Sequence, residues 1–153
     1  MNKTQIKKLN SKLLRHSFQH PNSISLGMPN QLFIEPTNFC NASCPLCPVG
    51  VHELGRKQGY MKMDTFDHIL NGFGPFLQDI YLWNYGEPFL HPEILEMIRK
   101  SHQMQIRTTI RTNGTGLYDQ QNIQKILSSG LDVLIISLDG ATSEIFNQYR
   151  IGV

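Results

Sequence analysis

Four short segments rich in apolar or β-branched residues alternate with helical patterns from residue 31 onward, and this alternation limits the chain to one fold class. The apolar segments have the length and the β-branched or aromatic content of strands. The segments between them carry apolar residues at the spacing of amphipathic helices. Strands alternating with helices predict a parallel sheet with right-handed crossovers, and therefore an α/β chain of four βα units. Strands are expected at 31–35, 79–84, 105–111 and 132–138, with a first helix capped by Asp64 and further helices from Pro92, over 119–129 and from about Thr142. The last strand is apolar on both faces, as a buried parallel strand should be.

Polar, glycine-bearing sequence follows each expected strand. In parallel βα folds, the ligand lies at the carboxyl ends of the strands, where these segments would meet. The four segments therefore predict one binding site at one edge of the sheet. They are the loop that holds the cysteines, Asn84-Tyr85-Gly86-Glu87-Pro88, Thr112-Asn113-Gly114, and Ser137-Leu138-Asp139-Gly140.

All three cysteines of the chain, Cys40, Cys44 and Cys47, lie in one window with C-x3-C-x2-C spacing. Thiolates are the usual protein ligands of iron–sulfur clusters. Three thiolates would hold three corners of a [4Fe–4S] cube and leave the fourth iron open to a small molecule, as in a catalytic rather than a closed structural site. A zinc site completed by His52 is the alternative, although zinc sites usually pair their cysteines as two C-x2-C units. Disulfides between cysteines this close in sequence are disfavoured, so we expect a reducing, cytoplasmic setting.

Composition excludes several other classes of protein. The chain has 153 residues, of which 40% are hydrophobic and 17% charged, as expected for a globular domain with its own core. The net charge of +2 gives no general electrostatic case for nucleic acid. No apolar run approaches the roughly 18 residues of a membrane span, and the N-terminus lacks the pattern of a signal peptide. We therefore expect neither a nucleic-acid partner nor a membrane.

Residues 1–30 differ from the rest in charge, since they contain basic residues but no acidic one. Ile6, Leu9 and Leu13 have the spacing of one helical face, which predicts a basic amphipathic helix. We favour a helix that packs on the main domain and leaves its basic face in solvent over one that contacts a membrane or nucleic acid. The predicted organisation is therefore an N-terminal helix and linker over 1–30 and a core domain over 31–153.

The motifs resemble those of the radical S-adenosylmethionine (SAM) superfamily over about residues 31–150. The cysteine window matches its C-x3-C-x2-C signature after the first strand, and Gly86-Glu87-Pro88 resembles its "GGE" segment after the second. Asn113-Gly114 and Ser137-Leu138-Asp139-Gly140, with Tyr149-Arg150 beyond them, look like the branch that often carries a SPASM or twitch extension. The resemblance implies a (β/α)6 partial barrel, similar to a TIM barrel, of which this chain would form the first four βα units.

The resemblance also implies two cofactors, a [4Fe–4S] cluster and SAM. By the family pattern Cys40, Cys44 and Cys47 hold three irons, and the amino and carboxylate groups of SAM bind the fourth. Glu87 would accept a hydrogen bond from the SAM ammonium. Arg150 would pair with the SAM carboxylate, which its planar fork suits.

Further contacts to SAM follow from the same resemblance. The backbone at Tyr85-Gly86 would run beside the methionyl group, with Tyr85 in place of the first glycine of the family segment. Ser137 would reach the ribose or methionyl region, and Leu46 takes the place of an aromatic residue near adenine. Asn113 and Asp139 complete the predicted cofactor-binding set. From the residues alone, Asn113-Gly114 also fits a plain turn, and Ser137 and Asp139 also fit caps of the next helix.

The implied activity is reductive cleavage of SAM to a 5′-deoxyadenosyl radical, which abstracts hydrogen from a peptide or small-molecule substrate. An electron donor such as flavodoxin or ferredoxin would reduce the cluster. The alternative is a catalytically incomplete remnant that binds a cluster or metal without turnover. The chain reaches one helix past its fourth strand, whereas the family core has six βα units. We therefore expect a missing C-terminal region or an oligomer to cover the open edge of the fourth strand.

Overall fold

A four-stranded parallel sheet forms the centre of the computed structural model, which describes residues 1–21 and 24–153. The strands lie in sequence order, each pairing in parallel with the next. This arrangement confirms the predicted α/β class and the succession of βα units. The strands are β1 (Gln31–Ile34), β2 (Asp79–Leu82), β3 (Arg107–Thr112) and β4 (Val133–Ile136). The third strand begins two residues later than predicted, because Gln105 adopts a positive φ of 58° in the turn that precedes it.

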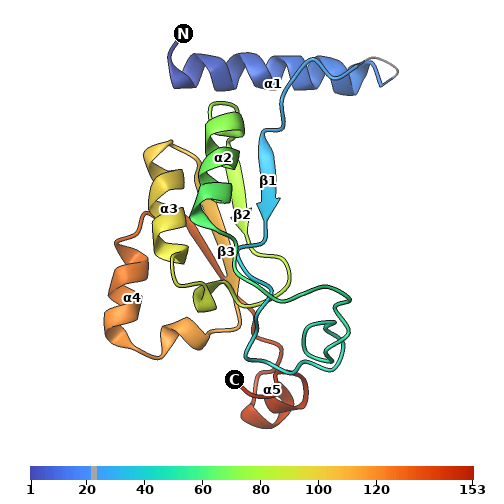
Figure 1. The fold of residues 1–153 in the computed structure, drawn as a ribbon, viewed down its shortest axis with the longest axis vertical. Coiled ribbons are helices and arrows are strands. Elements are labelled where there is room, and N and C mark those ends of the chain that lie inside the picture. The colour runs from blue at the N-terminus through green and yellow to red at the C-terminus, as the bar shows by residue number, and fades with distance from the viewer. Residues whose placement is uncertain (22–23) are drawn as a thin grey trace.

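Helices α2 (Met63–Phe73), α3 (Ile94–Gln103) and α4 (Gln120–Leu127) cover one face of the sheet, as Figure 1 shows. Helix α5 (Ser143–Tyr149) follows β4 and lies at the opposite end of the molecule from the N-terminus. Two short 3-10 helices, η1 (Pro88–Leu90) and η2 (Thr115–Leu117), follow β2 and β3. The expected cap at Asp64 is wrong, since α2 begins two residues earlier with Lys62 as its N-cap. Asp64 instead lies in the first turn, where its negative charge favours the helix dipole.

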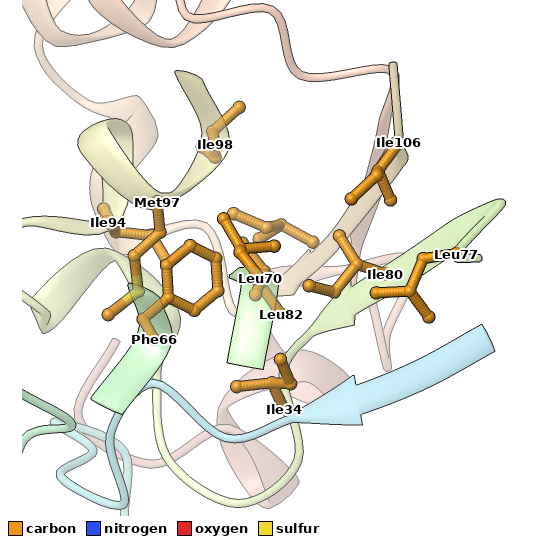
Figure 2. Close-up of a cluster of buried hydrophobic side chains, with 11 residues drawn as sticks. Ile34, Phe66, Leu70, Leu77, Ile80, Leu82, Ile94, Met97, Ile98 and Ile106 are labelled. Atoms are coloured by element: carbon orange, nitrogen blue, oxygen red, sulfur yellow. The ribbon is translucent and has the colours of Figure 1, made fainter. Parts of the chain in front are cut away.

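The hydrophobic core lies between this face of the sheet and helices α2 and α3 (Figure 2). Alternate residues of each strand point to opposite faces, so one set from each strand enters this layer. The buried members from the strands are Ile34, Ile80, Leu82 and Ile110, and those from the two helices are Phe66, Leu70, Ile94, Met97 and Ile98. This core fixes the carboxyl ends of the strands, from which the site loops leave.

Strand β4 is less buried than its apolar sequence predicts. Ile135 and Ile136 are 40% and 49% exposed, so the expectation of a strand buried on both faces is wrong. The reason is its place in the sheet, because β4 pairs with β3 on one side and stands at the edge. The open apolar edge expected at the fourth strand is therefore present in the described residues.

Helix α1 (Lys3–Gln19) lies across the end of the sheet where the strands begin (Figure 1). A capping box between Asn2 and Gln5 starts it. Its attachment is largely polar. Buried Asn10 exchanges two hydrogen bonds with the backbone of Met28, and Lys7 Nζ donates to the carbonyl of Gln105 at 2.6 Å. The predicted apolar packing is thus partial, since Leu9 is 47% exposed.

The predicted division into residues 1–30 and 31–153 stays a prediction, and residues 22–23 of its first part lie outside the described residues. Across 1–21 and 24–153, none of the helices combines the length and the apolar character needed to cross a membrane.

Candidate functional site

A cavity of about 370 Å³ opens at the carboxyl ends of the strands. Every residue of the predicted site lines it except Asp139, which pairs with one that does. The lining residues among those predicted are Cys40, Cys44, Leu46, Cys47, Tyr85, Gly86, Glu87, Asn113, Ser137 and Arg150. Segments separated by up to 110 residues therefore meet at one edge of the sheet, as the pattern of polar segments predicted.

The loop that carries the cysteines is tied at its base by two buried polar residues that follow β1. Thr37 Oγ1 donates to the Gly59 carbonyl at 2.9 Å. Asn38 bridges the same segment, donating to the Lys57 carbonyl at 3.0 Å and accepting from the Gly59 amide at 2.7 Å. These contacts close the long loop on itself and hold the cysteines beside the sheet. Sequence reasoning missed both residues, because their partners lie about twenty residues away and no local pattern indicates them.

A second tie joins the end of this loop to the segment after β2. The ring of His91 is buried, and its Nε2 lies 2.9 Å from the Met61 carbonyl. Its Nδ1 accepts from the Glu93 amide at 3.1 Å, just before α3. Both ring nitrogens are therefore occupied by backbone contacts, and His91 helps to fix the start of α3. The ring also links the cysteine loop to α3.

Gly86 permits the loop after β2 to approach the cysteine loop. Its φ of +86° lies in the left-handed region that glycine favours. A Cβ at this position would lie 2.4 Å from the Thr37 carbonyl oxygen and 2.8 Å from Asn38 Cα. Next to it, the Glu87 amide donates to the Phe39 carbonyl at 2.8 Å. The glycine is therefore required both by its backbone angle and by the close packing.

The three thiols line the cavity, and two of them accept hydrogen bonds from groups around it. The Cys40 sulfur accepts from the Ala42 amide at 3.4 Å and from Asn113 Nδ2 at 3.9 Å, and the Cys44 sulfur accepts from Arg150 Nη1 at 3.6 Å. Burial raises the pKa of the Cys40 thiol; the Ala42 amide opposes this, and the nearby Glu87 and cysteine charges add to it. A bound cation would reverse that effect, since metal ligation deprotonates a thiol.

Glu87 is 2% exposed and joins the ends of two strands. One carboxylate oxygen accepts from the Thr112 hydroxyl at 2.8 Å and from the Phe89 amide at 3.1 Å, and the other accepts from the Asn113 amide at 2.8 Å. Burial raises the pKa of Glu87, against the opposing effects of these three hydrogen bonds and of the Arg150 charge. A carboxylate offers about four lone-pair positions, so one position remains beside the cavity for a further donor.

Arg150, just after α5, reaches back to the cysteine loop. Its Nε donates to Asp139, and its Nη1 donates to Cys44. The Ser43 amide also donates to the Ile151 carbonyl at 2.7 Å, so the chain after α5 is fixed on this loop. Asp139 therefore orients Arg150 rather than lining the cavity.

Two residues for which the sequence left alternatives have more than one partner. Asn113 forms the turn, accepting from the Thr115 amide at 2.9 Å, while Gly114 has a φ of +98°. Its side chain nevertheless also lines the cavity. Ser137 is 7% exposed, and its hydroxyl accepts from Arg111 Nε at 2.9 Å. The cap of α5 is Thr142, so neither Ser137 nor Asp139 caps that helix.

Several further residues line the cavity that were not singled out as site residues, although Asn84, Thr112 and Tyr149 belong to the segments predicted to meet there. A signal for two of them existed, because strand alternation places Trp83 beyond Tyr81 and Arg111 beyond Thr109 on the face opposite the core. Of the others, Ala42, Pro48 and Asn84 lie on loops, where no such period applies, whereas Thr112 ends β3 and Tyr149 ends α5. The residues in question are Ala42, Pro48, Trp83, Asn84, Arg111, Thr112 and Tyr149.

The donor set fits an iron–sulfur cluster in its chemistry. Three free thiols face one cavity, and those of Cys40 and Cys44 receive N–H donors, which tune cluster sulfurs and ligands. Within the part of the chain that the structure describes, no three His, Cys, Asp or Glu side chains converge as they would on a single ion. The corners of a cube require a different arrangement, because each thiolate binds a different iron.

Comparison with known proteins gives a family match over most of the chain. The family model described as the Radical SAM superfamily matches residues 34–152. The tungsten-containing aldehyde ferredoxin oxidoreductase cofactor-modifying protein of Pyrococcus furiosus is 33% identical over 110 residues, which is 71% of this chain and 30% of that protein. An AdoMet-dependent heme synthase of Methanosarcina barkeri is 27% identical over 80% of this chain and 34% of its own length. The chain thus spans about a third of the length of these curated relatives.

Solved structures share the fold. Streptococcus suis SuiB bound to S-adenosylmethionine superposes with a TM-score of 0.67 at 20% identity, over 91% of this chain and 31% of SuiB. BtrN in complex with AdoMet and 2-DOIA superposes with a TM-score of 0.65 at 20% identity, over 81% of this chain and 53% of BtrN. At this level of identity the likeness concerns the arrangement of strands and helices.

Proposed function

Since the chain belongs to the radical SAM superfamily, we propose that it forms the cluster- and SAM-binding part of an enzyme that cleaves SAM reductively. The observation that carries the proposal is the meeting of three free thiols, a buried carboxylate and an arginine around one cavity at the carboxyl ends of the strands. In parallel βα folds this edge is where ligands bind. The carboxylate and the arginine are complementary in charge to the ammonium and the carboxylate of SAM, and the three thiols are suitable ligands for the irons of the cluster.

In this proposal Cys40, Cys44 and Cys47 hold a [4Fe–4S] cluster. The N–H groups of Ala42 and Arg150 stabilise the thiolate charge on two of the three sulfurs. When bound, the reduced cluster supplies the electron that cleaves SAM, and the resulting 5′-deoxyadenosyl radical takes hydrogen from the substrate. The residues of the chain hold and orient the reactants for this step.

The proposed SAM contacts follow from charge. Glu87 accepts from the SAM ammonium with its remaining lone-pair position, and Arg150 donates to the SAM carboxylate. Asp139 keeps the Arg150 fork in place. The backbone of Tyr85 and Gly86 runs beside the methionyl group.

Three further residues complete the proposed binding site. Ser137 and Asn113 contribute from the ends of β4 and β3, where both line the cavity. Leu46 is 83% exposed, and we propose that this open apolar side chain packs against adenine when SAM binds.

The substrate is proposed as a class only. The relatives include proteins named PqqA peptide cyclase, from Gluconobacter oxydans, and AdoMet-dependent heme synthase, so their names span peptides and small molecules. We propose a peptide or small-molecule substrate for this chain, with an electron donor such as flavodoxin or ferredoxin. Free thiols suit a reducing cytoplasm. A further region or a second subunit is proposed to cover the edge of β4.

The test is formation of 5′-deoxyadenosine. The chain is reconstituted anaerobically with iron and sulfide, mixed with SAM and dithionite, and analysed for 5′-deoxyadenosine by mass spectrometry. Product is expected from the wild type and from the surface control Arg99→Gln, and loss of product is expected from Cys44→Ala. A cluster that forms without yielding product would indicate the incomplete remnant. A colourless, zinc-loaded protein would overturn the proposal.

A further inference from the structure

The face of the sheet opposite the core carries a group of aromatic side chains beside the cavity. Phe33 of β1 stacks on Tyr81 of β2, with ring centroids 4.3 Å apart and planes 11° apart. Trp83 meets Phe33 edge to face at 5.6 Å. Phe33 is 63% exposed, although strands usually bury such a ring. We call these three residues, together with Arg111, the inner-face cluster.

Arg111 gives this cluster a charge. Its guanidinium carbon lies 5.6 Å from the centre of the Trp83 ring, within the range of a cation–π contact. Its Nε donates to Ser137 Oγ at 2.9 Å, which fixes the direction of the planar group. Both Trp83 and Arg111 line the cavity with the cysteines, so the cluster continues into the site described above.

Arg111 also lacks a counter-charge. Four other arginines, Arg56, Arg99, Arg107 and Arg150, each pair with a carboxylate. Within residues 1–21 and 24–153, Arg111 pairs with none, and its terminal nitrogens have no hydrogen-bond acceptor there. An oriented guanidinium with both terminal nitrogens free is suited to a bidentate carboxylate. Arg111 is exposed, so a ligand can reach these nitrogens, and beside them Trp83 Nε1 is buried without an acceptor in the described part of the chain.

We propose that the inner-face cluster is the substrate subsite, and that it selects an organic carboxylate whose neighbouring group is aromatic. The carboxylate binds the Arg111 fork, and the aromatic group packs on the exposed ring of Phe33. The inference rests on the proposed function, because it assigns the cluster to the substrate of that same site. It also separates two arginines by role, with Arg150 serving SAM and Arg111 serving the substrate.

Trp83 is the single tryptophan of the chain, so its fluorescence reports on the subsite directly. The metal-free chain is titrated with 3-phenylpropionate and with 3-phenylpropionamide, which has the same shape without the charge. We expect saturable quenching by the acid and binding of the amide that is weaker by about tenfold or more, as for a lost charge-assisted hydrogen bond. Equal binding of the two, or no saturable quenching by the acid, would overturn the proposal, and this comparison needs no variant.

Variants then locate the charge. Arg111→Gln is expected to weaken the acid by about the same factor and to leave the amide unchanged, whereas the surface control Arg99→Gln changes neither. Unchanged binding of the acid to a folded Arg111→Gln protein would contradict the assignment of Arg111.

A last binding experiment tests whether the substrate subsite is distinct from the SAM site. Equilibrium dialysis of labelled 3-phenylpropionate against the reconstituted chain is expected to give the same affinity with and without saturating SAM. Loss of binding on addition of SAM would assign Arg111 to the SAM site and refute the subsite. Failure of the proposed function shows instead as absence of 5′-deoxyadenosine, which the fluorescence titration does not require.

Discussion

Replacing Glu87 by alanine should destabilise the fold even when no cofactor is bound. The carboxylate accepts from the amides of Phe89 and Asn113 and from the Thr112 hydroxyl, and it is 2% exposed. Removing the carboxylate leaves these three donors buried without an acceptor. The hydroxyl of Thr112 can turn to another acceptor, but the two amides are fixed by the backbone of η1 and of the segment after β3.

The expected loss follows from those two amides. A buried donor without an acceptor costs about 1–3 kcal/mol, which gives about 2–6 kcal/mol for both. Removing the buried charge returns part of this, because burial raises the pKa of Glu87 and so disfavours its ionised form. We therefore expect Glu87→Ala to lower the free energy of unfolding by about 3 kcal/mol, which corresponds to roughly 6–12 °C in Tm for a domain of this size.

The assay is urea unfolding of the metal-free chain, followed by far-UV circular dichroism. Glu93→Ala serves as the matched control, since Glu93 is exposed at the start of α3 and its side chain makes no capping hydrogen bond. A Glu87→Ala protein that unfolds within about 0.5 kcal/mol of this control, the usual range of surface substitutions, would refute the structural role of the carboxylate.

Three further predictions concern the same region. Gly86→Ala should lower the free energy of unfolding in urea by about 2 kcal/mol or more, because its Cβ would lie 2.4 Å from the Thr37 carbonyl oxygen. Gly114 also has a positive φ but has open space around it, so Gly114→Ala should lower the free energy of unfolding by only about 1 kcal/mol. Equal losses for the two variants would show that the close approach at Gly86 is unimportant. Asn38→Ala removes the hydrogen bonds of Asn38 to Lys57 and Gly59, so it should lower the free energy of unfolding by about 2 kcal/mol. It should also increase the rate at which a protease cuts the cysteine loop. An unchanged rate of proteolysis would contradict the role of Asn38 in closing this loop. Because the pKa of Glu87 is raised, the folded state binds its proton more tightly than the unfolded state does, and the contribution of Glu87 to stability falls as the pH rises from the ordinary carboxyl pKa through the raised one. The free energy of unfolding of the wild type minus that of Glu87→Gln, measured in urea across that pH range, should therefore decrease with pH. A flat or rising difference would contradict the raised pKa.

The fold was predictable because its signals are local and repeated. β1, β2 and β4 lie in short apolar runs, β3 lies in a segment rich in β-branched residues, and a helix follows each, so the parallel order could be anticipated. The segment predicted from residue 119 indeed begins a helix there, where Asp119 accepts from the amides of Gln121 and Asn122 as the N-cap of α4. Asp64 misled because aspartate is favourable both as an N-cap and in the first turn, and the sequence does not distinguish the two.

The sequence predicted which residues would meet at the site, but it did not predict the hydrogen bonds between them. Tyr85, Gly86 and Glu87 could be placed at the cavity because the loop after a parallel strand has only one edge of the sheet to occupy. The partners of Glu87 could not, since Thr112 and Asn113 are 25 and 26 residues away and come from another strand end. The role of Asp139 beside Arg150 depends on where α5 places the arginine, which no periodicity reveals.

The sequence also did not predict how far the strand at the edge of the sheet would be buried. The run from Val133 to Ile136 has the composition of a central strand, yet β4 has one neighbouring strand and exposes Ile135 and Ile136. Composition reports what a strand can bury, whereas its place in the sheet decides what is buried. The same distinction applies to Phe33, whose exposure only becomes informative once Arg111 is seen beside the same face.

The central claim is that the three cysteines hold a [4Fe–4S] cluster whose fourth iron binds SAM. The most direct measurement is electron paramagnetic resonance of the reconstituted, dithionite-reduced chain, recorded before and after addition of SAM. The account predicts the signal of a reduced [4Fe–4S] cluster that changes shape when SAM binds the open iron, and no such signal from Cys44→Ala. A wild-type cluster whose signal is unaffected by saturating SAM, or a chain that takes up zinc and gives no signal, would contradict it.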